Sequence, residues 1–413
     1  MINSKVFRNT SWMLGGLGAR AILQFLYFII IARLLGSRDY GIFVATASLI
    51  GIASPFSTWG SGNILIKYVS RERSLFGKYW GSALATTLTS SIAIMMIVIG
   101  ISRFILPESV PIIVVVLLSV SDLLFSRLSD LCGQAFQAFE RLKETSGIQI
   151  ISNTIRLAFA CCFLFFSDRS SIIAWSAMYF FAAGISAFIS ILWVFSELGS
   201  GKFSLVPMFS HFKEGGLFSV SLSSQTIYND IDKTMLASLV NLDGAGLYAT
   251  SYRIIDVAFT PVKSLLYSTY AKFFQFGEEG IEGSLRLSRR ILPFAVLYGG
   301  IFIFASFLLS PLIHIIFGTK FVGSEYYLRL LSPLIFLKSL HYLAADALTG
   351  ADKQNVRTLA QILVAAINVI LNLILLPVFG VIGAIISSIA CDLILAVLLW
   401  SIVIYACWMG RRK

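Results

Sequence analysis

The feature that most constrains this chain is the recurrence of long apolar stretches along its 413 residues. A helix needs about 20 mostly apolar residues to cross a bilayer, and only helices or closed barrels can cross, because backbone polar groups find no water in lipid. The runs are continuous and not alternating, which favours helices. We therefore predict an all-α membrane protein with about twelve transmembrane helices: 10–35, 41–66, 79–102, 109–138, 145–167, 170–196, 213–240, 245–271, 290–317, 324–350, 355–377 and 379–408.

The charge distribution in the loops predicts the orientation of these helices. Of the 32 Lys and Arg residues, nine lie well inside predicted spans, 19 lie in or at the edge of one set of loops that includes both termini, and four lie in the opposite set. Loops rich in Lys and Arg face the cytoplasm, so we expect both termini there. The same bias accounts for the net charge of +11 without a nucleic-acid partner. The first apolar run is too long for a signal peptide, so we expect it to stay attached as the first span.

A weak internal repeat relates the two halves of the chain. Residues 35–46 can be laid on residues 240–251 at an offset of 205, each with a tight turn and a Gly–aliphatic–aromatic triplet. Six spans fall in each half with the same orientation, which is a parallel repeat. Transporters bind substrates between such repeats, near the bilayer midplane. We predict two pseudo-symmetric six-helix bundles, residues 1–204 and 205–413, around a central cavity.

Polar stripes on two of the helices coincide under this repeat. The first helix carries Arg20, Gln24 and Tyr27 on one face, and the seventh carries Gln225, Asn229 and Asp232 at the equivalent positions. Such stripes can be interhelical hydrogen-bonding contacts. A charge at mid-membrane costs roughly 2.5–3.5 kcal/mol on insertion scales, so a cation such as Arg20 favours a cavity lining.

Other predicted spans carry charges with open alternatives. On the eighth, Arg253 and Asp256 can form a structural pair or belong to a cavity site, while Lys263 has no partner on its own helix and suits an anion. His341 can relay protons or be a satisfied structural histidine. Asp392 stands alone on the twelfth span. The remaining stripes are Asp122, Ser126 and Ser129; Arg127 and Asp130, which we expect to pair; Gln149, Asn153 and Arg156; Lys338, His341, Tyr342 and Asp346; and Gln361, Asn368 and Asn372.

Motifs for catalysis and cofactor binding are missing from the sequence. There is no phosphate-binding Gly-Lys-Ser/Thr loop, no His-Glu metal motif and no Gly-x-Ser-x-Gly elbow. The five cysteines lack metal-ligand spacing and show no disulfide framework. The loops are too short for an ATPase or hydrolase domain. We expect no enzyme activity, no catalytic residue, no metal and no cofactor.

Four segments, 32–43, 232–253, 311–321 and 368–384, resemble the multidrug/oligosaccharidyl-lipid/polysaccharide exporter superfamily, and within it the Wzx-type O-antigen flippases. The resemblance implies two six-helix lobes forming a V around a cavity that opens to one side at a time. It implies transport of an undecaprenyl-diphosphate-linked oligosaccharide to the periplasmic face of the bacterial inner membrane. Related lipid II flippases place an Arg in the first helix and another in the eighth, which Arg20 and Arg253 match, although those flippases have two further helices.

From the stripes and the resemblance together we assign expected roles. The cavity cations, expected on an anionic cargo, are Arg20, Arg253, Lys263, Arg156 and Lys338; the polar contacts for sugars are Gln24, Tyr27, Gln225 and Asn229; the candidates for coupling to an ion gradient are Asp122, Asp256, Asp232, Asp346 and Asp392. Expected partners are the lipid-linked oligosaccharide, membrane lipid, a polysaccharide polymerase and a chain-length regulator. The alternatives are a flippase for another lipid-linked glycan (capsule, teichuronic acid or common antigen), a cation-coupled multidrug antiporter, and a membrane polymerase or ligase.

Overall fold

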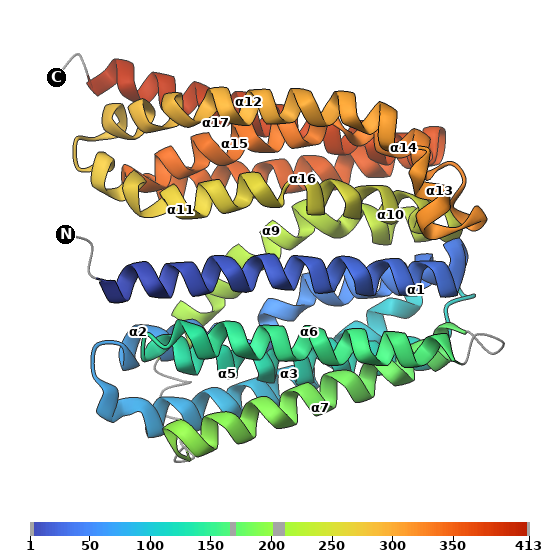
Figure 1. Ribbon diagram of the computed structural model, residues 1–413, viewed down its shortest axis with the longest axis horizontal. Helices are drawn as coiled ribbons and strands as arrows, with labels where there is room; N and C mark the ends of the chain where they lie inside the picture. The colour runs from blue at the N-terminus through green and yellow to red at the C-terminus, as the bar shows by residue number, and fades with distance from the viewer. Residues whose placement is uncertain (1–3, 166–170, 201–210, 411–413) are drawn as a thin grey trace. The chain divides into compact units, whose positions relative to one another are not determined.

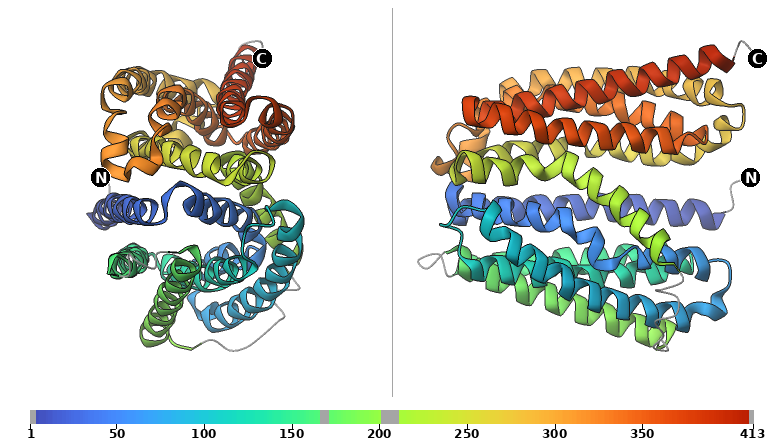
Figure 2. Two further views of the ribbon diagram at one scale, coloured as in Figure 1. Left: turned by 90° about the vertical axis from the view of Figure 1, so that its right-hand side faces the viewer. Right: turned by 180° about the vertical axis from the view of Figure 1, so that it is seen from behind.

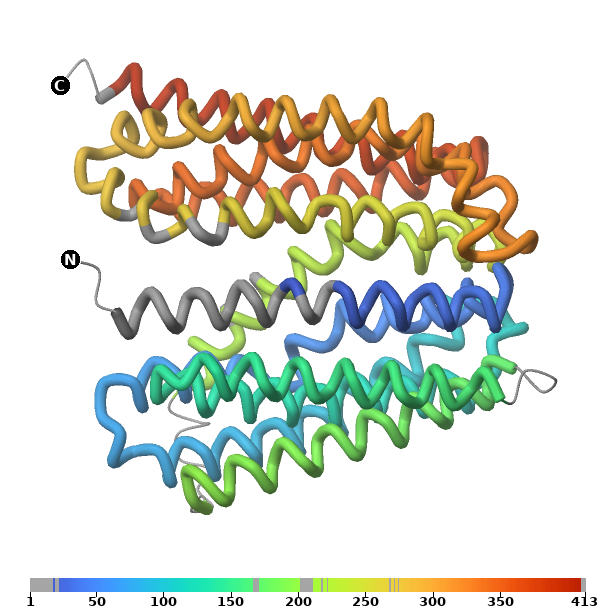
Figure 3. The backbone as a smooth tube through the Cα atoms, viewed as in Figure 1, coloured from blue at the N-terminus to red at the C-terminus, as the bar shows by residue number. Residues whose placement is uncertain are grey.

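The computed structural model describes residues 4–165, 171–200 and 211–410, whose backbone can be followed in Figure 3. Within these ranges, the side chains of 4–17, 19–21, 217, 221, 267, 268, 271, 274 and 410 lie outside the description. All regular elements of the described residues are helices, so the all-α prediction is confirmed. The chain forms two compact units, residues 1–226 and 227–413. The predicted boundary between residues 204 and 205 lies outside the described residues.

Unit 1 contains the helices of the first six predicted spans (Figure 1). Its elements are α1 (Ser4–Thr58), α2 (Ser61–Val69), η1 (Arg73–Leu75), α3 (Phe76–Ile105), α4 (Ile112–Ser119), η2 (Val120–Phe125), α5 (Ser126–Ala138), α6 (Leu142–Leu164) and α7 (Ile172–Leu198). The division between the units falls inside α9 (Phe212–Leu239), and the part of α9 up to Thr226 belongs to unit 1.

Unit 2 contains the second part of α9 and the helices that follow it. These are α10 (Leu242–Ala258), α11 (Thr260–Gly277), α12 (Ile281–Leu309), α13 (Leu312–Phe317), η4 (Thr319–Phe321), α14 (Ser324–Leu331), α15 (Pro333–Gly350), α16 (Gln354–Phe379) and α17 (Val381–Gly410). Helix α15 packs against α12 and α17, and α17 also packs against α16. Figure 2 shows the long helices within unit 2 running side by side.

Eight helices of the described part are long and apolar enough to cross a membrane. The first, Ile22–Thr58, covers two predicted spans, because Gly36 breaks α1 with φ 76° and ψ 177°, a conformation that glycine adopts without a Cβ clash. Three further predicted spans, 213–240, 245–271 and 324–350, correspond to α9, α10 with α11, and α14 with α15. They do not reach the length and apolar character of a membrane span, because α9 is rich in charges and because Pro261 and Pro333 interrupt the other two. The structure is therefore consistent with twelve spans.

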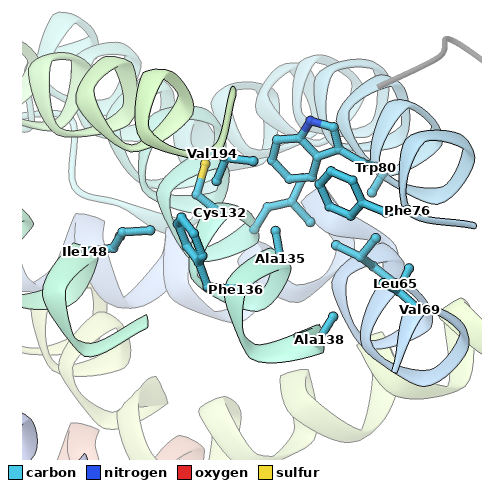
Figure 4. Close-up of a cluster of buried hydrophobic side chains, with 12 residues drawn as sticks. Leu65, Val69, Phe76, Trp80, Cys132, Ala135, Phe136, Ala138, Ile148 and Val194 are labelled. Carbon is cyan, nitrogen blue, oxygen red and sulfur yellow. The ribbon is translucent and has the colours of Figure 1, made fainter. Parts of the chain in front are cut away.

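A cluster of buried apolar side chains holds together one end of unit 1 (Figure 4). Trp80 and Phe136 are fully buried within it. The Trp80 ring stacks on Phe76, and the Phe136 ring packs on Trp193 of α7, with centroids 5.9 and 5.5 Å apart. Rings of this size contribute most of the apolar area that a core removes from contact with its surroundings. Because the cluster joins α2, α3, α5, α6 and α7, it fixes the helices on which the polar residues of unit 1 lie.

Candidate functional site

Unit 1 contains a polar cluster around Asp122, within the π-helical turn η2. The Asp122 carboxylate accepts hydrogen bonds from the hydroxyls of Tyr179 (2.7 Å) and Ser126 (3.3 Å). Arg156 donates to the Ser126 hydroxyl at 2.8 Å, and its guanidinium lies over the Tyr179 ring, 5.0 Å from the centroid. A π turn inserts one extra residue into a helix and is frequent at functional sites. The cluster therefore links an acid on the fourth span to a cation on the fifth through one hydroxyl.

A polar pocket of about 110 Å³ lies next to this cluster, between α1, α5, α6 and α7 of unit 1. It is lined by Gln24, Arg127 and Gln149, among others, and it has room for several waters. Among the described residues, the Ser129 hydroxyl and the Arg156 Nε are buried near it without a protein hydrogen-bond partner. A buried polar atom is costly when it is left unpaired, so we expect water or a polar ligand to occupy the pocket.

The other predicted site residues of unit 1 lie in different surroundings. The expected ion pair of Arg127 and Asp130 is present at 3.0 Å, so the positive charge of Arg127 is partly neutralised. The Tyr27 ring packs on Trp175, with centroids 5.7 Å apart, and its buried hydroxyl has no protein partner within the described part of the chain. Gln225 is exposed in unit 1. The side chain of Arg20 lies outside the described residues.

In unit 2, Asp232 is the centre of a buried hydrogen-bond network. Its carboxylate is only 3% exposed and accepts bonds from Tyr248 (2.9 Å), Ser388 (2.7 Å) and Asn372 (2.6 Å). Four helices, α9, α10, α16 and α17, supply these groups. The neighbouring cation Lys233 pairs with Asp230 instead. Asp232 is thus an acid that hydrogen-bond donors surround and with which no described Lys or Arg forms an ion pair.

A second part of the network surrounds Lys338, which is 4% exposed. Its ammonium donates to the Tyr252 hydroxyl at 2.8 Å, and Lys233 lies over the same ring, 5.0 Å from its centroid. Tyr252 in turn packs against Tyr248, which donates a hydrogen bond to Asp232; the two tyrosine ring centroids lie 5.7 Å apart. Lys338 is therefore a buried cation inside unit 2, next to the Asp232 network.

The cations of the eighth span are held less tightly. Arg253 and Asp256 are half-buried, and they form no ion pair with each other or with another described side chain, so the predicted alternative of a structural pair is wrong. Lys263 is exposed and contacts the Phe259 ring, 5.5 Å from its centroid. Half-buried Asn229 lies in the same unit. Arg253 and Lys263 are thus able to bind an anion without breaking an existing ion pair.

Two interpretations made one helix at a time are corrected by contacts between helices. Asp392 does not stand alone: its Oδ1 lies 3.2 Å from the Nε2 of His341, and both side chains are 3% exposed. The sequence missed this pair because the two residues are on different helices, α15 and α17. Asp346, expected near Lys338 on one face, lies 3.5 Å from Arg357 of the next helix, α16. Arg357 also donates to Thr349 at 2.8 Å.

Comparison with solved structures identifies the fold as that of a group of membrane transporters. The chain superposes on the inward-facing conformation of a multidrug resistance MATE family transporter of the MOP superfamily with a TM-score of 0.77 and 12% identity, covering 94% of this chain and 96% of that one. It superposes on the inward closed conformation of the lipid II flippase MurJ with a TM-score of 0.74 and 13% identity, covering 96% and 86%.

Sequence comparison supplies the family. Residues 6–266, more than half of the chain, match the polysaccharide biosynthesis protein family, and the chain belongs to that family. It is also similar to a protein of Haloferax volcanii described as the probable low-salt glycan biosynthesis flippase Agl15, with 23% identity over 375 residues, 89% of this chain and 76% of that protein. The superfamily resemblance inferred from the four sequence segments is therefore confirmed.

Proposed function

We propose that this protein is a flippase that moves a lipid-linked glycan across the membrane by alternating access. The proposal rests on two observations taken together. The chain belongs to a family of polysaccharide biosynthesis proteins, and cations such as Lys338 and Arg253 lie inside its membrane-spanning helices. Charges at this depth are retained where they serve transport. A diphosphate between lipid and sugar is the anion that they would neutralise, while the lipid tail stays in the bilayer.

The substrate that we favour is an undecaprenyl-diphosphate-linked O-antigen repeat unit, moved from the cytoplasmic to the periplasmic leaflet of a bacterial inner membrane. Both termini would then be cytoplasmic, and the polysaccharide polymerase and chain-length regulator would act next on the cargo. A flippase for another lipid-linked glycan has the same chemistry at the diphosphate and differs only in the sugar. The pocket beside Arg156, with its hydroxyls and amides, offers hydrogen bonds of the kind that sugars accept.

The contacts rank the proposed cations. Arg156 donates to Ser126 and Lys338 donates to Tyr252, so both are partly committed within their units. Arg253 and Lys263 form no ion pair with a described side chain, and Arg20 is added to them from the sequence pattern of the first span alone. Arg can bind two phosphate oxygens at once, whereas Lys acts as a point charge. We therefore assign the first diphosphate contacts to Arg20 and Arg253.

The test replaces these two residues in a strain whose surface polysaccharide depends on this gene. We expect Arg20→Ala and Arg253→Ala each to reduce surface polysaccharide strongly, and Arg→Lys at either position to restore only part of it. Arg103→Ala, which removes the same charge from the loop side of α3, is the matched control and should have no effect. Full surface polysaccharide in the double alanine variant would refute the cation assignment. Efflux of cationic dyes instead of glycan flipping would favour a multidrug antiporter.

We propose that an ion gradient supplies the energy for transport, and that buried acids bind and release the ion. Asp122 is linked to Arg156 through Ser126, and Asp346 lies beside Arg357, so each of these acids already has a protein cation nearby. Asp232 and Asp392 have no described Lys or Arg as an ion-pair partner. A carboxylate without a fixed cation is the one that can exchange a mobile ion. We therefore place ion coupling in unit 2, at Asp232 and Asp392, with half-buried Asp256 as the further candidate.

A further inference from the structure

The buried pair of His341 and Asp392 differs from the other charged contacts of the described chain. Each side chain is 3% exposed, and the imidazole Nε2 lies 3.2 Å from the carboxyl Oδ1. The angles between them fall outside hydrogen-bond geometry, and neither atom has another hydrogen-bond partner among the described residues. Two titratable groups thus lie next to each other, both buried and neither held by a hydrogen bond at these atoms.

Packing holds the two groups in this position. Trp400, on the same helix as Asp392, donates its indole N–H to the carbonyl of Leu340 at 3.1 Å, which ties α17 to α15 beside His341. The imidazole ring stacks on Tyr342, with centroids 4.8 Å apart, and meets the edge of Tyr228 at 6.2 Å. The site is therefore built by three helices, α9, α15 and α17, and does not depend on a mobile surface side chain.

Charge balance decides how many protons this pair holds. A carboxylate opposite a neutral imidazole would leave one uncompensated negative charge in the bundle, which costs several kcal/mol. One bound proton makes the pair neutral. An imidazolium facing a carboxylate would also be neutral, but it would require the desolvation of two ions. The favoured state is a neutral imidazole facing a protonated Asp392.

The surrounding helices contribute no further acid in contact with His341 within the described residues. Helix α15 itself carries Lys338, Tyr342 and Asp346, and Asp346 is paired with Arg357 of α16. Helix α12 places the hydroxyl of Ser288 beside α15, where it donates to the Leu343 carbonyl at 3.4 Å. The titratable residues of the neighbouring elements include Tyr228, Asp230, Asp232 and Lys233 of α9; Tyr248, Tyr252, Arg253 and Asp256 of α10; Lys263 of α11; Glu282, Arg286, Arg289, Arg290 and Tyr298 of α12; and Cys391 of α17.

We propose that His341 and Asp392 form a proton-binding site that takes up one proton on the Asp392 carboxyl and makes the proton the coupling ion. The proposal rests on the flippase function proposed above. While the pair is buried, as it is in this structure, Asp392 is a carboxylic acid. When water reaches the pair, the acid releases its proton to water and becomes a carboxylate, and the reverse step takes one proton from water.

The position of Asp392 on α17 gives this proton an effect on the Asp232 network. Ser388 lies one turn before Asp392 on the same helix face, and its hydroxyl donates to Asp232 at 2.7 Å. Release of the proton puts a second negative charge one helical turn from the Ser388–Asp232 contact. We expect this charge to disfavour the Asp232 carboxylate, because like charges repel in a medium of low dielectric. Deprotonation would then weaken the Ser388–Asp232 hydrogen bond between α17 and α9, which couples proton release to a change within unit 2.

Infrared spectroscopy of the purified full-length protein in lipid nanodiscs tests the protonation directly. We expect a carboxylic acid C=O band that persists at neutral pH and shifts when the protein is made with ¹³C-labelled aspartate, which identifies the band as Asp without any substitution. Asp392→Asn should remove the band. His341→Gln should move its titration. The matched control Asp352→Asn removes an exposed acid from the turn after α15 and should leave the band unchanged.

The outcomes separate this site from the flippase function. Absence of a protonated Asp in the labelled wild-type protein, or a band that survives in Asp392→Asn, would overturn the proton site. In vesicles holding an undecaprenyl-diphosphate-linked oligosaccharide, an imposed pH gradient should drive flipping by the wild type, and Asp392→Asn should lose this response. A wild-type protein that shows the band but flips no glycan would refute the proposed function and leave the proton site standing.

Discussion

At the scale of single residues, the acids within the helices fall into two groups. Asp122 and Asp346 have a protein cation nearby, whereas Asp232 and Asp392 form no ion pair with a described Lys or Arg. The carboxylate of Asp122 is linked through Ser126 to Arg156, so unit 1 supplies its own counter-charge. Asp232 receives three neutral donors, and Asp392 faces an imidazole. An acid with a fixed cation contributes to stability over a wide pH range, whereas one without such a cation responds to mobile ions. This contrast supports the proposed ion exchange at Asp232 and Asp392, and it predicts a structural role for Asp122.

Arg156→Met tests the structural role. Removal of the guanidinium leaves the Asp122 carboxylate without its counter-charge, and we expect unfolding to become easier by about 2 kcal/mol. The double variant Arg156→Met/Asp122→Asn removes both charges and should recover most of this loss. Thermal unfolding in detergent, read as a double-mutant cycle, measures the coupling between the two residues. Additive effects of the two single substitutions would show that they do not act as a pair.

At the scale of elements, close backbone approach fixes where α11 meets α15. A Cβ placed on Gly350, the last residue of α15, would lie 2.3 Å from the carbonyl oxygen of Phe273 in α11. The backbone cannot yield as a side-chain tip can, so we expect Gly350→Ala to destabilise the protein by roughly 1–3 kcal/mol. Gly300→Ala is the control, because a Cβ there meets nothing within 4 Å. Its unfolding temperature should match or exceed that of the wild type.

The sequence predicts the elements well because span length and apolar character are local properties. All twelve predicted spans have helical counterparts. Four of them differ from single uninterrupted membrane helices, because Gly36 kinks the long helix that contains the first two and because Pro261 and Pro333 each interrupt one other span. The extra residue in the π turn around Asp122 leaves no pattern that we could detect. Pairs such as His341 with Asp392 could not be predicted, because periodicity shows which residues share a face but not which face of another helix lies opposite.

At the scale of the whole molecule, the proposed mechanism gives the two units different tasks. Unit 1 has a polar pocket lined by Arg127, Asp130 and Arg156, with hydroxyl and amide groups that suit a sugar. Unit 2 has the buried acids without a described Lys or Arg partner. A coupled flippase needs both a contact for its polar cargo and a site that exchanges an ion. A sequence repeat therefore does not imply equal roles, since the equivalent helices have acquired different charges.

The orientation of the whole chain follows from loop charge alone and can be tested without knowledge of the substrate. Because 19 loop cations lie on the side of both termini and four on the other, we expect green fluorescent protein fused after Lys413 to fluoresce and alkaline phosphatase fused there to be inactive. Fusions truncated after Arg103 or Lys320 should show the reverse pattern, and they serve as the internal control. Active phosphatase after Lys413 would invert the topology. The cation-rich loops would then lie outside the cytoplasm, against the positive-inside rule. The proposed direction of flipping would have to be reversed as well.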